Sequence, residues 1–226
     1  MYELFIANKN YSSWSLRPWA VMKALGIPFR ETLVHFIDGA NFDRFRKFAP
    51  NGKVPCLHHD GRIVWDSLAI AEYLAERHDG VWPKDEAARA WARSAAAEMH
   101  SGFSTLRNHR PMNIGVRIEP ASTDAATAAD IARIDELWCE GLERFGGPFL
   151  AGAAFTAVDA FFSPVAYRAQ TYGIVLSDKA ADYAAHLRAQ PFLMEWEEAG
   201  LAETMREPGH DAEIAAIGKL VADLRG

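Results

Sequence analysis

The chain has 226 residues, of which 50% are hydrophobic and 24% charged, so it has enough apolar material for a buried core and is not composed like a disordered chain. Its formal net charge of -6 gives no overall positive field, and we therefore expect neither nucleic acid nor a membrane surface as a partner. No apolar run approaches the length of about 20 residues that a membrane span needs. Met1 leads directly into a strand-like segment and not into a signal peptide, which favours a cytoplasmic location.

The two cysteines, Cys56 and Cys139, are too few for a disulfide framework, and their separation matches no common spacing of metal ligands. The eight histidines are scattered along the chain. We expect both thiols to be buried and no metal to be bound.

The chain up to about residue 80 alternates between strand and helix patterns. Gly26 follows the first helical pattern where a left-handed terminal residue belongs, and Asp60-Gly61 marks a hairpin turn. The expected elements are a strand at 2–7, a helix at 15–25, a strand at 32–36, a short helix at 41–48, a hairpin at 55–64 and a helix from 66 or 67. A parallel crossover followed by an antiparallel hairpin predicts one mixed sheet of four strands.

A polar stretch from 79 to 85 predicts a linker between a first domain at 1–80 and a second at 86–226. No convincing strand pattern follows it, so the second domain is expected to be a helical bundle. Thr156 and Asp159 have the spacing of a capping box at the start of one helix. Other helices are expected at 86–108, at 126–145 and after Pro208, where helical spacing returns at Ile214, Ile217, Leu220 and Val221. The predicted class is therefore α/β plus all-α.

The segment Asn10–Arg17, between the first strand and the first helix, gathers small hydroxyl side chains. Ser13 or Ser15 suits the N-cap, because a serine hydroxyl accepts a hydrogen bond from a free N–H of the first turn. The same helix end also favours an anion such as a thiolate, since it combines free N–H groups with the positive end of the dipole. Taken alone, the segment is more typical of a cap.

Lys53-Val54-Pro55 stands at the entry of an expected strand. Proline cannot donate to a ladder, so it must lie at a strand start or edge. If the Val54-Pro55 bond is cis, the Val54 N–H and C=O face an extended ligand, which can add as a short strand. An ordinary trans turn is the alternative that the segment favours by itself.

Asp66 and Ser67 open the third helix. They are sufficient as a plain cap, with no function. As a binding site, the Ser67 N–H and hydroxyl suit a carboxylate, and Asp66 suits an ammonium group. Together they suit the α-amino-acid end of a ligand.

In this order and at these separations, the serine segment, the Lys53-Val54-Pro55 turn, Asp66-Ser67 and the capping segment 155–159 resemble the glutathione transferase superfamily. The resemblance covers essentially the whole chain. It implies a thioredoxin-like N-terminal domain that binds glutathione as co-substrate, without a metal, and an all-helical domain that supplies the pocket for an electrophile.

The resemblance also implies how glutathione lies. Its backbone pairs with Val54 beside Pro55, its γ-glutamyl end is held by Asp66 and Ser67, and Lys53 faces the glycyl carboxylate.

For the thiol, the resemblance is to the serine-type theta and zeta classes, which place the activating hydroxyl fifteen positions before the apolar residue that follows the helix-ending glycine. Counting back from Ile27 gives Ser12, with the neighbouring Ser13 as the alternative. Zeta proteins carry a cysteine two places after the first serine, where this chain has Trp14. The class therefore stays open.

The pocket for the second substrate is expected to involve Trp14, Arg107 and Arg110. The two arginines suit an acidic substrate, although they also suit a solvated helix end whose dipole they complement. Zeta-class isomerases hold a substrate carboxylate with an arginine, and the corresponding position here is Thr171, with Arg168 three residues earlier. A glutathione-dependent isomerase of the maleylacetoacetate type is thus one alternative function.

The resemblance as a whole implies a cytoplasmic, homodimeric glutathione transferase of the detoxification type. A non-catalytic glutathione transferase-like binding protein is a second alternative. A thiol oxidoreductase would need a cysteine where Ser12 stands. The electrophile stays open, as does the reaction type among conjugation, peroxide reduction, isomerisation and dehalogenation.

Overall fold

The N-terminal domain is built on a four-stranded sheet in a computed structural model that describes residues 1–37, 39 and 41–226. The sheet has the order β2-β1-β3-β4, with β1 parallel to β2 and antiparallel to β3. The strands are β1 (Tyr2–Ile6), β2 (Phe29–Leu33), β3 (Cys56–His59) and β4 (Arg62–Trp65). Asp60 and Gly61 turn the β3-β4 hairpin with φ angles of 48° and 76°. The predicted mixed sheet is confirmed.

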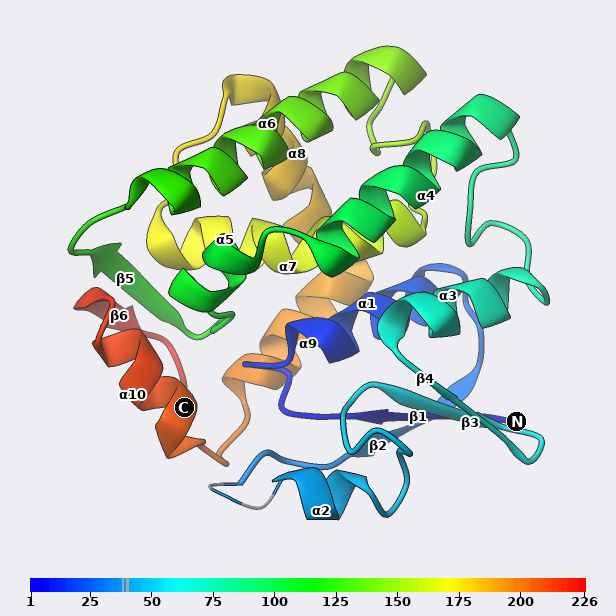
Figure 1. The fold of residues 1–226 in the computed structure, drawn as a ribbon, viewed down its shortest axis with the longest axis horizontal. Coiled ribbons are helices and arrows are strands. Elements are labelled where there is room, and N and C mark those ends of the chain that lie inside the picture. The colour runs from blue at the N-terminus through cyan, green and yellow to red at the C-terminus, as the bar shows by residue number, and fades with distance from the viewer. Residues whose placement is uncertain (38, 40) are drawn as a thin grey trace.

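Three helices accompany this sheet: α1 (Ser13–Ala24), α2 (Asn41–Phe45) and α3 (Ser67–Ala75). In Figure 1, α1 and α3 lie between the sheet and the helical domain, and α2 lies on the other side of the sheet. Leu16, Trp19 and Ala20 of α1 are fully buried, and α1 packs on both α3 and α7. The thioredoxin-like arrangement therefore places the start of α1 at the boundary with the helical domain.

Two elements of this domain, β2 and α2, have bounds that differ by three residues from the predicted ones. The second strand was expected at 32–36 but spans Phe29–Leu33, because β1 ends at Ile6 and the last ladder bond runs from the Val34 N–H to the Ile6 carbonyl (2.8 Å). The second helix ends at Phe45 and not at residue 48. The next turn closes with a hydrogen bond that spans three residues and not four, from the Phe48 N–H to the Phe45 carbonyl (3.1 Å).

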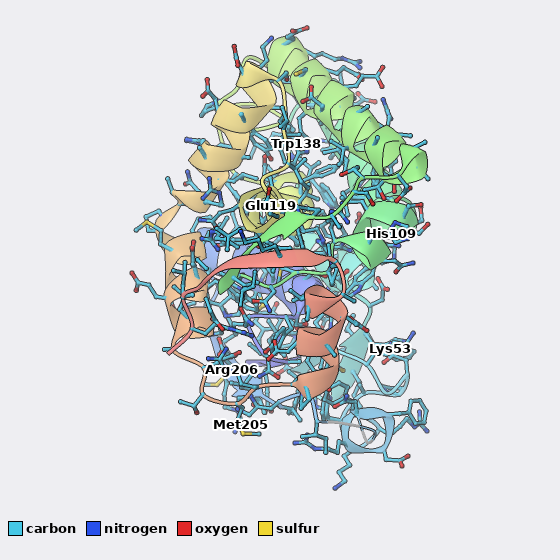
Figure 2. All side chains as sticks on the ribbon, turned by 90° about the vertical axis from the view of Figure 1, so that its left-hand side faces the viewer. Lys53, His109, Glu119, Trp138, Met205 and Arg206 are labelled. Carbon is cyan, nitrogen blue, oxygen red and sulfur yellow. The ribbon has the colours of Figure 1, made fainter. Side chains whose placement is uncertain are left out.

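The C-terminal domain is mainly helical, as predicted, and is arranged around α7. All but two of the residues of α7 are buried, and α4, α6 and α8 surround it (Figure 1). Trp138 of α6 lies inside this domain (Figure 2). The helices are α4 (Glu86–Ser101), α5 (Ser104–His109), α6 (Ala125–Phe145), α7 (Ala157–Tyr172), α8 (Asp178–Arg188), α9 (Pro191–Leu201) and α10 (Pro208–Ala215).

The single helix expected at 86–108 is wrong, because the chain breaks between α4 and α5. Gly102 leaves the helix with φ -99° and ψ -165°, and Phe103 adopts a left-handed conformation with φ 52°. Phe103 is buried in the core, so packing of its ring outweighs the cost of this backbone conformation. The break re-aims α5 towards the N-terminal domain.

A two-stranded ribbon corrects the expectation that no strand follows the linker. β5 (Val116–Pro120) pairs antiparallel with β6 (Gly218–Asp223), although helical spacing predicted a helix through Val221. α10 ends before this segment, and β6 then runs beside β5 (Figures 1 and 2). The pairing partner lies about 100 positions away in sequence, so a local pattern does not reveal it.

Asp159 completes the predicted capping segment at the start of α7. Its carboxylate accepts hydrogen bonds from the N–H groups of Thr156 (2.9 Å) and Leu150 (3.0 Å) and from the Tyr183 hydroxyl (2.9 Å). The side chain is fully buried, and burial raises the pKa of Asp159 to about 6 against the effect of these hydrogen bonds. Asp159 therefore connects the start of α7 to α8 and to the preceding loop.

One apolar core runs through both domains, and Trp19 of α1 meets Trp196 of α9 with ring centroids 5.0 Å apart. Cys56 is buried as expected, whereas Cys139 is only half-buried because it faces Ser177 (3.3 Å) at the edge of α6. Among the described residues, no helix is both long and apolar enough to cross a bilayer.

Candidate functional site

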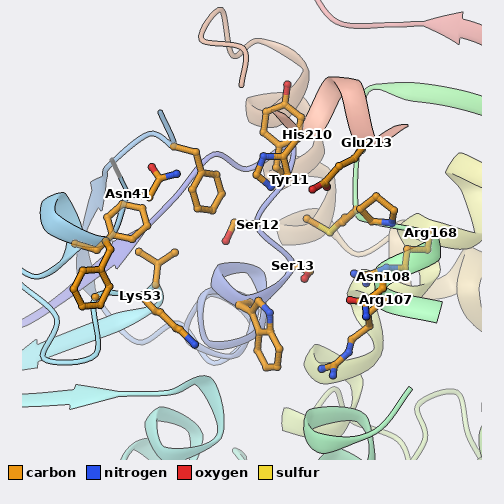
Figure 3. A pocket seen from close by; sticks show the side chains of 18 residues that line it. Tyr11, Ser12, Ser13, Asn41, Lys53, Arg107, Asn108, Arg168, His210 and Glu213 are labelled. Carbon is orange, nitrogen blue, oxygen red and sulfur yellow. The ribbon is translucent and has the colours of Figure 1, made fainter. Parts of the chain in front are cut away.

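A cavity of about 580 Å³ lies where the start of α1 faces the helical domain. Figure 3 shows Ser12 and Ser13 in its middle, Lys53 on one side, and Arg107 and Arg168 on the other. Side chains from both domains therefore border one space.

Ser12 is the N-cap of α1. Its Oγ accepts a hydrogen bond from the Ser15 N–H (3.3 Å) and donates one to the Ser15 Oγ (2.7 Å). The cap expected at Ser13 or Ser15 is thus found one residue before Ser13. The reason is a turn in which the N–H groups of Tyr11 and Ser12 both donate to the Asn8 carbonyl, which brings Ser12 to the helix start.

Ser13 is the first residue of α1 and lines the cavity together with Ser12. The two side chains are similarly buried, with exposed fractions of 8% and 4%. Within the described part of the chain, the Ser13 hydroxyl makes no hydrogen bond to another protein group. Its donor is therefore left for a ligand at the positive end of α1.

Lys53 and Val54 form the opposite border of the cavity. The Val54-Pro55 peptide bond is cis. Lys53 is exposed and Val54 half-buried, whereas Pro55 is buried at the entry of β3 and does not line the cavity. The turn thus presents its first two residues to the space beside α1.

Asp66 and Ser67 lie at the start of α3, outside the cavity lining. Asp66 caps the helix by accepting the Leu68 N–H (2.9 Å), and its other oxygen lies 3.3 Å from Nε2 of His100. Ser67 is 1% exposed, and its hydroxyl has no hydrogen-bond partner among the described residues. An unpaired buried hydroxyl of this kind is an open position for a polar ligand group.

The helical domain contributes Arg107 and Arg168 to the lining of the cavity, and Arg107 lies next to Trp14 of α1. The Arg107 guanidinium lies over the Trp14 ring, 5.3 Å from its centroid, and donates to the His100 carbonyl (3.1 Å). Arg168 of α7 is 3% exposed, lines the same cavity and donates from Nε to the Arg110 carbonyl (2.7 Å).

Arg110 itself lies elsewhere. Its guanidinium donates to the carbonyls of His109 and Ser122, both at 2.8 Å, and it borders a second cavity beside α6 and β5. α5 ends at His109, and Arg110 leaves the helix with φ -137° and ψ 66°, which separates it from Arg107. Of the two arginines expected in the second-substrate pocket, only Arg107 lines the cavity.

The C-terminal segment closes the cavity with residues that the sequence analysis left without a role. His210 and Glu213 of α10 are part of the lining. The His210 ring stacks on Tyr11 with centroids 4.9 Å apart, and its Nδ1 lies 2.5 Å from Oε2 of Glu207. The Tyr11 hydroxyl donates to Asp211 (3.1 Å), and burial raises the pKa of Tyr11. No local signal marks these residues, because the contact joins positions 200 apart.

Arg17 is a fully buried cation one helical turn from the start of α1. Its guanidinium carbon lies 4.0 Å from the centroid of Trp14 and 4.9 Å from that of Phe161. Within the described residues, none of its three nitrogens has a hydrogen-bond partner. Burial, followed by the charges of Arg168 and Arg107, lowers the pKa of Arg17 well below its usual value. The sequence signal for Arg17 was a charged residue between Leu16 and Pro18, in the mainly apolar part of the first helix.

The family model described as Glutathione S-transferase, N-terminal domain, matches residues 11–77. A Caenorhabditis elegans protein described as a probable maleylacetoacetate isomerase is 27% identical over 205 residues, which cover 80% of this chain and 92% of that protein. Glutathione S-transferase theta-1 of Mus musculus is 28% identical over 157 residues, covering 63% of this chain and 65% of the relative.

Solved structures show the same fold at low sequence identity. A glutathione transferase homolog from Burkholderia, with bound glutathione, has a TM-score of 0.67 at 21% identity and covers 88% of this chain and 97% of its own. A diazinon-metabolizing glutathione S-transferase of Bombyx mori has a TM-score of 0.69 at 16% identity, with the same coverage of 88% and 97%. The family match over residues 11–77 includes both serines at the start of α1, the Lys53-Val54 turn and the start of α3, so this part of the chain is a glutathione S-transferase N-terminal domain, and the relatives that cover more of the chain support the glutathione transferase superfamily.

Proposed function

We propose that this chain is a glutathione transferase, which binds glutathione beside the start of α1 and activates its thiol for attack on an electrophilic small molecule. The observation that carries the proposal is that Ser12 and Ser13 line one cavity with Lys53 and Val54. The homolog with bound glutathione has the same fold, which supports the assignment of the ligand.

Activation of the thiol is a matter of its pKa. A free thiol has a pKa of about 8.5, so it is mostly protonated at neutral pH, whereas the thiolate is the nucleophile. A decrease of about two units requires about 2.7 kcal/mol of preferential binding of the thiolate. A serine hydroxyl and the N-terminus of α1 act on the same atom here, and both favour the anion.

The hydrogen bonds of the two serines assign them different tasks in this proposal. The count from the family resemblance points to Ser12, but the Ser12 hydroxyl already caps α1 and donates to Ser15. Ser13 lines the same cavity, and its hydroxyl has no partner in the part of the chain that the structure describes. We therefore assign the thiolate hydrogen bond to Ser13 and the positioning of the helix start to Ser12.

The two ends of the glutathione tripeptide bind to polar groups near the cavity. The γ-glutamyl end lies at Asp66 and Ser67, where the unpaired Ser67 hydroxyl faces a carboxylate and Asp66 accepts from the ammonium group. The backbone pairs with Val54, and the exposed Lys53 neutralises the glycyl carboxylate.

Replacing Asp66 or Ser67 by alanine tests this placement. Each variant loses a hydrogen bond to a charged group, so we expect glutathione binding to weaken by about 1–3 kcal/mol in calorimetric titrations. Asp60→Ala, at the exposed tip of the β3-β4 hairpin, is the control and should bind like the wild type. Unchanged affinity in both Asp66→Ala and Ser67→Ala contradicts the placement.

A glutathione-dependent isomerase is the second candidate, because three relatives are described as maleylacetoacetate isomerases or probable ones. One of them, from Dictyostelium discoideum, is 29% identical over 182 residues, or 73% of this chain and 80% of the relative. Thr171, at the position of the isomerase arginine, donates to the Asn113 carbonyl (2.7 Å) and is buried away from the cavity. Arg168 lines the cavity instead.

Glutathione consumption separates the candidate functions. A screen of conjugation, peroxide reduction, isomerisation and dehalogenation should consume glutathione with an electrophile if the chain is a transferase. Turnover of maleylacetoacetate without net loss of glutathione supports the isomerase. Glutathione binding without any turnover supports a binding protein and contradicts both enzymes.

A homodimer, a cytoplasmic location and a role in detoxification complete the proposal and rest on the family resemblance. A two-domain subunit of this kind associates through an apolar seam between the sheet domain of one copy and the helices of the other. Analytical ultracentrifugation at micromolar concentration should therefore give twice the mass of one chain. A monomer under these conditions excludes the dimer.

A further inference from the structure

Three arginines from three helices gather beside the cavity: Arg17 on α1, Arg107 on α5 and Arg168 on α7. Burial lowers the pKa of each, and the charge of Arg107 lowers those of Arg17 and Arg168 further. Within the described part of the chain, none of the three forms an ion pair with a carboxylate. Three neighbouring positive charges are therefore held without an ion-pair partner among the residues that the structure describes.

The acidic groups near this arginine cluster are engaged elsewhere. Asp66 and Asp130 act on Arg17 and Arg107 from a distance, but both already accept a backbone N–H in the first turn of a helix. Glu213 lines the cavity but is exposed, so solvent screens its charge. Burial of an uncompensated cation is costly, and clusters of this kind mark positions that an anion completes.

Arg107 and Arg168 have donors that the protein does not use. The Nη1 group of Arg107 donates to the His100 carbonyl. The Nε and Nη1 groups of Arg168 donate to the carbonyls of Arg110 and Pro164, respectively. Among the described residues, the Nη2 groups of both arginines have no hydrogen-bond partner, and both side chains line the cavity. Two guanidinium groups with free N–H donors suit a planar carboxylate.

Arg17 contributes differently, because it lies behind the Trp14 ring and does not line the cavity. Trp14 thus separates the fully buried positive charge of Arg17 from the cavity. The Arg107 guanidinium also contacts this ring, 5.3 Å from its centroid. Arg17 raises the positive potential on this side of the cavity without a direct bond to a ligand.

We propose that the side of the cavity formed by Arg107 and Arg168 binds a carboxylate group on the electrophile. The inference rests on the proposed function, since it places the glutathione thiol at Ser13. Figure 3 shows Ser13 between Lys53 and the two arginines, so a carboxylate held by the arginines directs the rest of the electrophile towards the thiol. The thiolate sulfur then bonds to the electrophilic carbon, the leaving group departs with the electron pair of its bond, and the carboxylate is unchanged.

A matched pair of electrophiles tests the inference. 4-Chloro-3,5-dinitrobenzamide and 4-chloro-3,5-dinitrobenzoate lose the same chloride from rings with the same nitro groups, but only the second carries a carboxylate. After division by the rates with free glutathione, we expect kcat/KM of the wild type to favour the benzoate. Arg107→Gln and Arg168→Gln should each lower this preference by about tenfold or more, because a charge-assisted hydrogen bond is lost.

Two controls isolate the position and the charge. Arg144→Gln removes an exposed arginine at the end of α6, outside the cavity, and should keep the wild-type preference. Arg107→Lys keeps the charge and should retain more of the preference than Arg107→Gln. If Arg168→Gln fails to fold because its carbonyl partners are buried, the half-buried Arg107 carries the test alone.

The outcomes distinguish this inference from the proposed function. Equal preferences in the wild type and both glutamine variants overturn the carboxylate site, as does a loss that appears only in the affinity for glutathione. If neither electrophile reacts, the transferase proposal fails, and calorimetry of the glutathione-saturated protein still tests the site. In that case 3,5-dinitrobenzoate must bind more tightly than the neutral 3,5-dinitrobenzamide, and equal affinities overturn the inference.

Discussion

At the start of α1, two adjacent serines differ in what their hydroxyl groups bind. Ser12 bonds the backbone and side chain of Ser15, whereas Ser13 lines the cavity and its hydroxyl bonds none of the described residues. One position is therefore occupied by a structural bond, and the next is available for chemistry. Arg17, on the same helix, is buried and positive, which adds to the preference of this helix end for an anion.

The structural role of Ser12 predicts a difference in stability. Loss of an N-cap hydroxyl costs about 1 kcal/mol, so Ser12→Ala should lower the free energy of unfolding by about that amount. Ser13→Ala removes no hydrogen bond to any of the described residues and should cost clearly less. Urea denaturation of both variants measures the difference, and equal losses would refute the assignment of the cap to Ser12.

Asp159 predicts how stability depends on pH. Because burial raises its folded pKa to about 6, above the value of an exposed aspartate, folding favours the neutral carboxyl. This contribution is complete below about pH 4 and is lost as the pH rises through 6, with a total of about 3 kcal/mol. The difference in unfolding free energy between the wild type and Asp159→Asn should therefore fall between pH 4 and 7. A difference that stays constant or grows with pH contradicts the raised pKa.

At the scale of elements, the β5-β6 ribbon holds α10, and thus His210 and Glu213, against the cavity. The ribbon requires a glycine at 218, where a Cβ would overlap the Glu119 carbonyl oxygen and lie 2.7 Å from the Cα of Pro120. Only glycine fits at this position, because the backbones of β5 and β6 lie so close together. Pairing with β5 therefore outweighs the helical spacing of the apolar residues around it.

Gly218→Ala should therefore loosen the C-terminal segment. We expect a loss of about 1–3 kcal/mol in stability, because a methyl group is forced into a packed contact. Hydrogen exchange of residues 203–226 should become faster. Gly226→Ala is the matched control, since its Cβ would lie 3.9 Å from the nearest atom, the Leu201 carbonyl oxygen. Unchanged exchange in Gly218→Ala would show that the ribbon tolerates the methyl group.

The elements that the sequence predicted best are those whose signal is local. The hairpin at Asp60-Gly61 and the start of α3 at Asp66 follow from turn and cap chemistry within a few residues. The start of β2 and the whole of β6 depend on partner strands, and the break at Phe103 depends on burial of its ring. These three features are decided by tertiary contacts, which no short window of sequence contains.

At the scale of the whole molecule, one core joins both domains. Trp19 of the first domain packs on Trp196 of the second, and the Trp196 Nε1 donates to the Lys9 carbonyl (2.9 Å). Glu203 further accepts from the Lys9 N–H (2.6 Å), so the segment after α9 is bonded to the end of β1. The cavity depends on this junction, since both domains border it.

A shared core predicts a single cooperative unfolding transition. Hydrogen exchange in increasing urea should show β1 and α7 losing protection at the same denaturant concentration, because neither domain retains its core without the other. Two separate midpoints would show that the domains unfold independently.

Of the residues that line the cavity, the sequence pointed to several in the N-terminal domain but to only Arg107 in the helical domain. Ser12, Ser13, Lys53 and Val54 lie within one family pattern and meet in one cavity. Arg168 was noted only as a neighbour of another position. It reaches the cavity because α7 crosses α1, a contact between residues about 150 positions apart.

In the proposed function, the Ser13 hydroxyl at the start of α1 lowers the pKa of the glutathione thiol. The most direct measurement is the ultraviolet absorbance of the thiolate, titrated against pH in complexes of glutathione with the wild type, Ser12→Ala and Ser13→Ala. In the wild type we expect the pKa of the bound thiol to lie about two units below the free value of about 8.5. It should return towards that value in Ser13→Ala and change less in Ser12→Ala. The same pKa in the wild type and Ser13→Ala, or an increase only in Ser12→Ala, would contradict this role of Ser13.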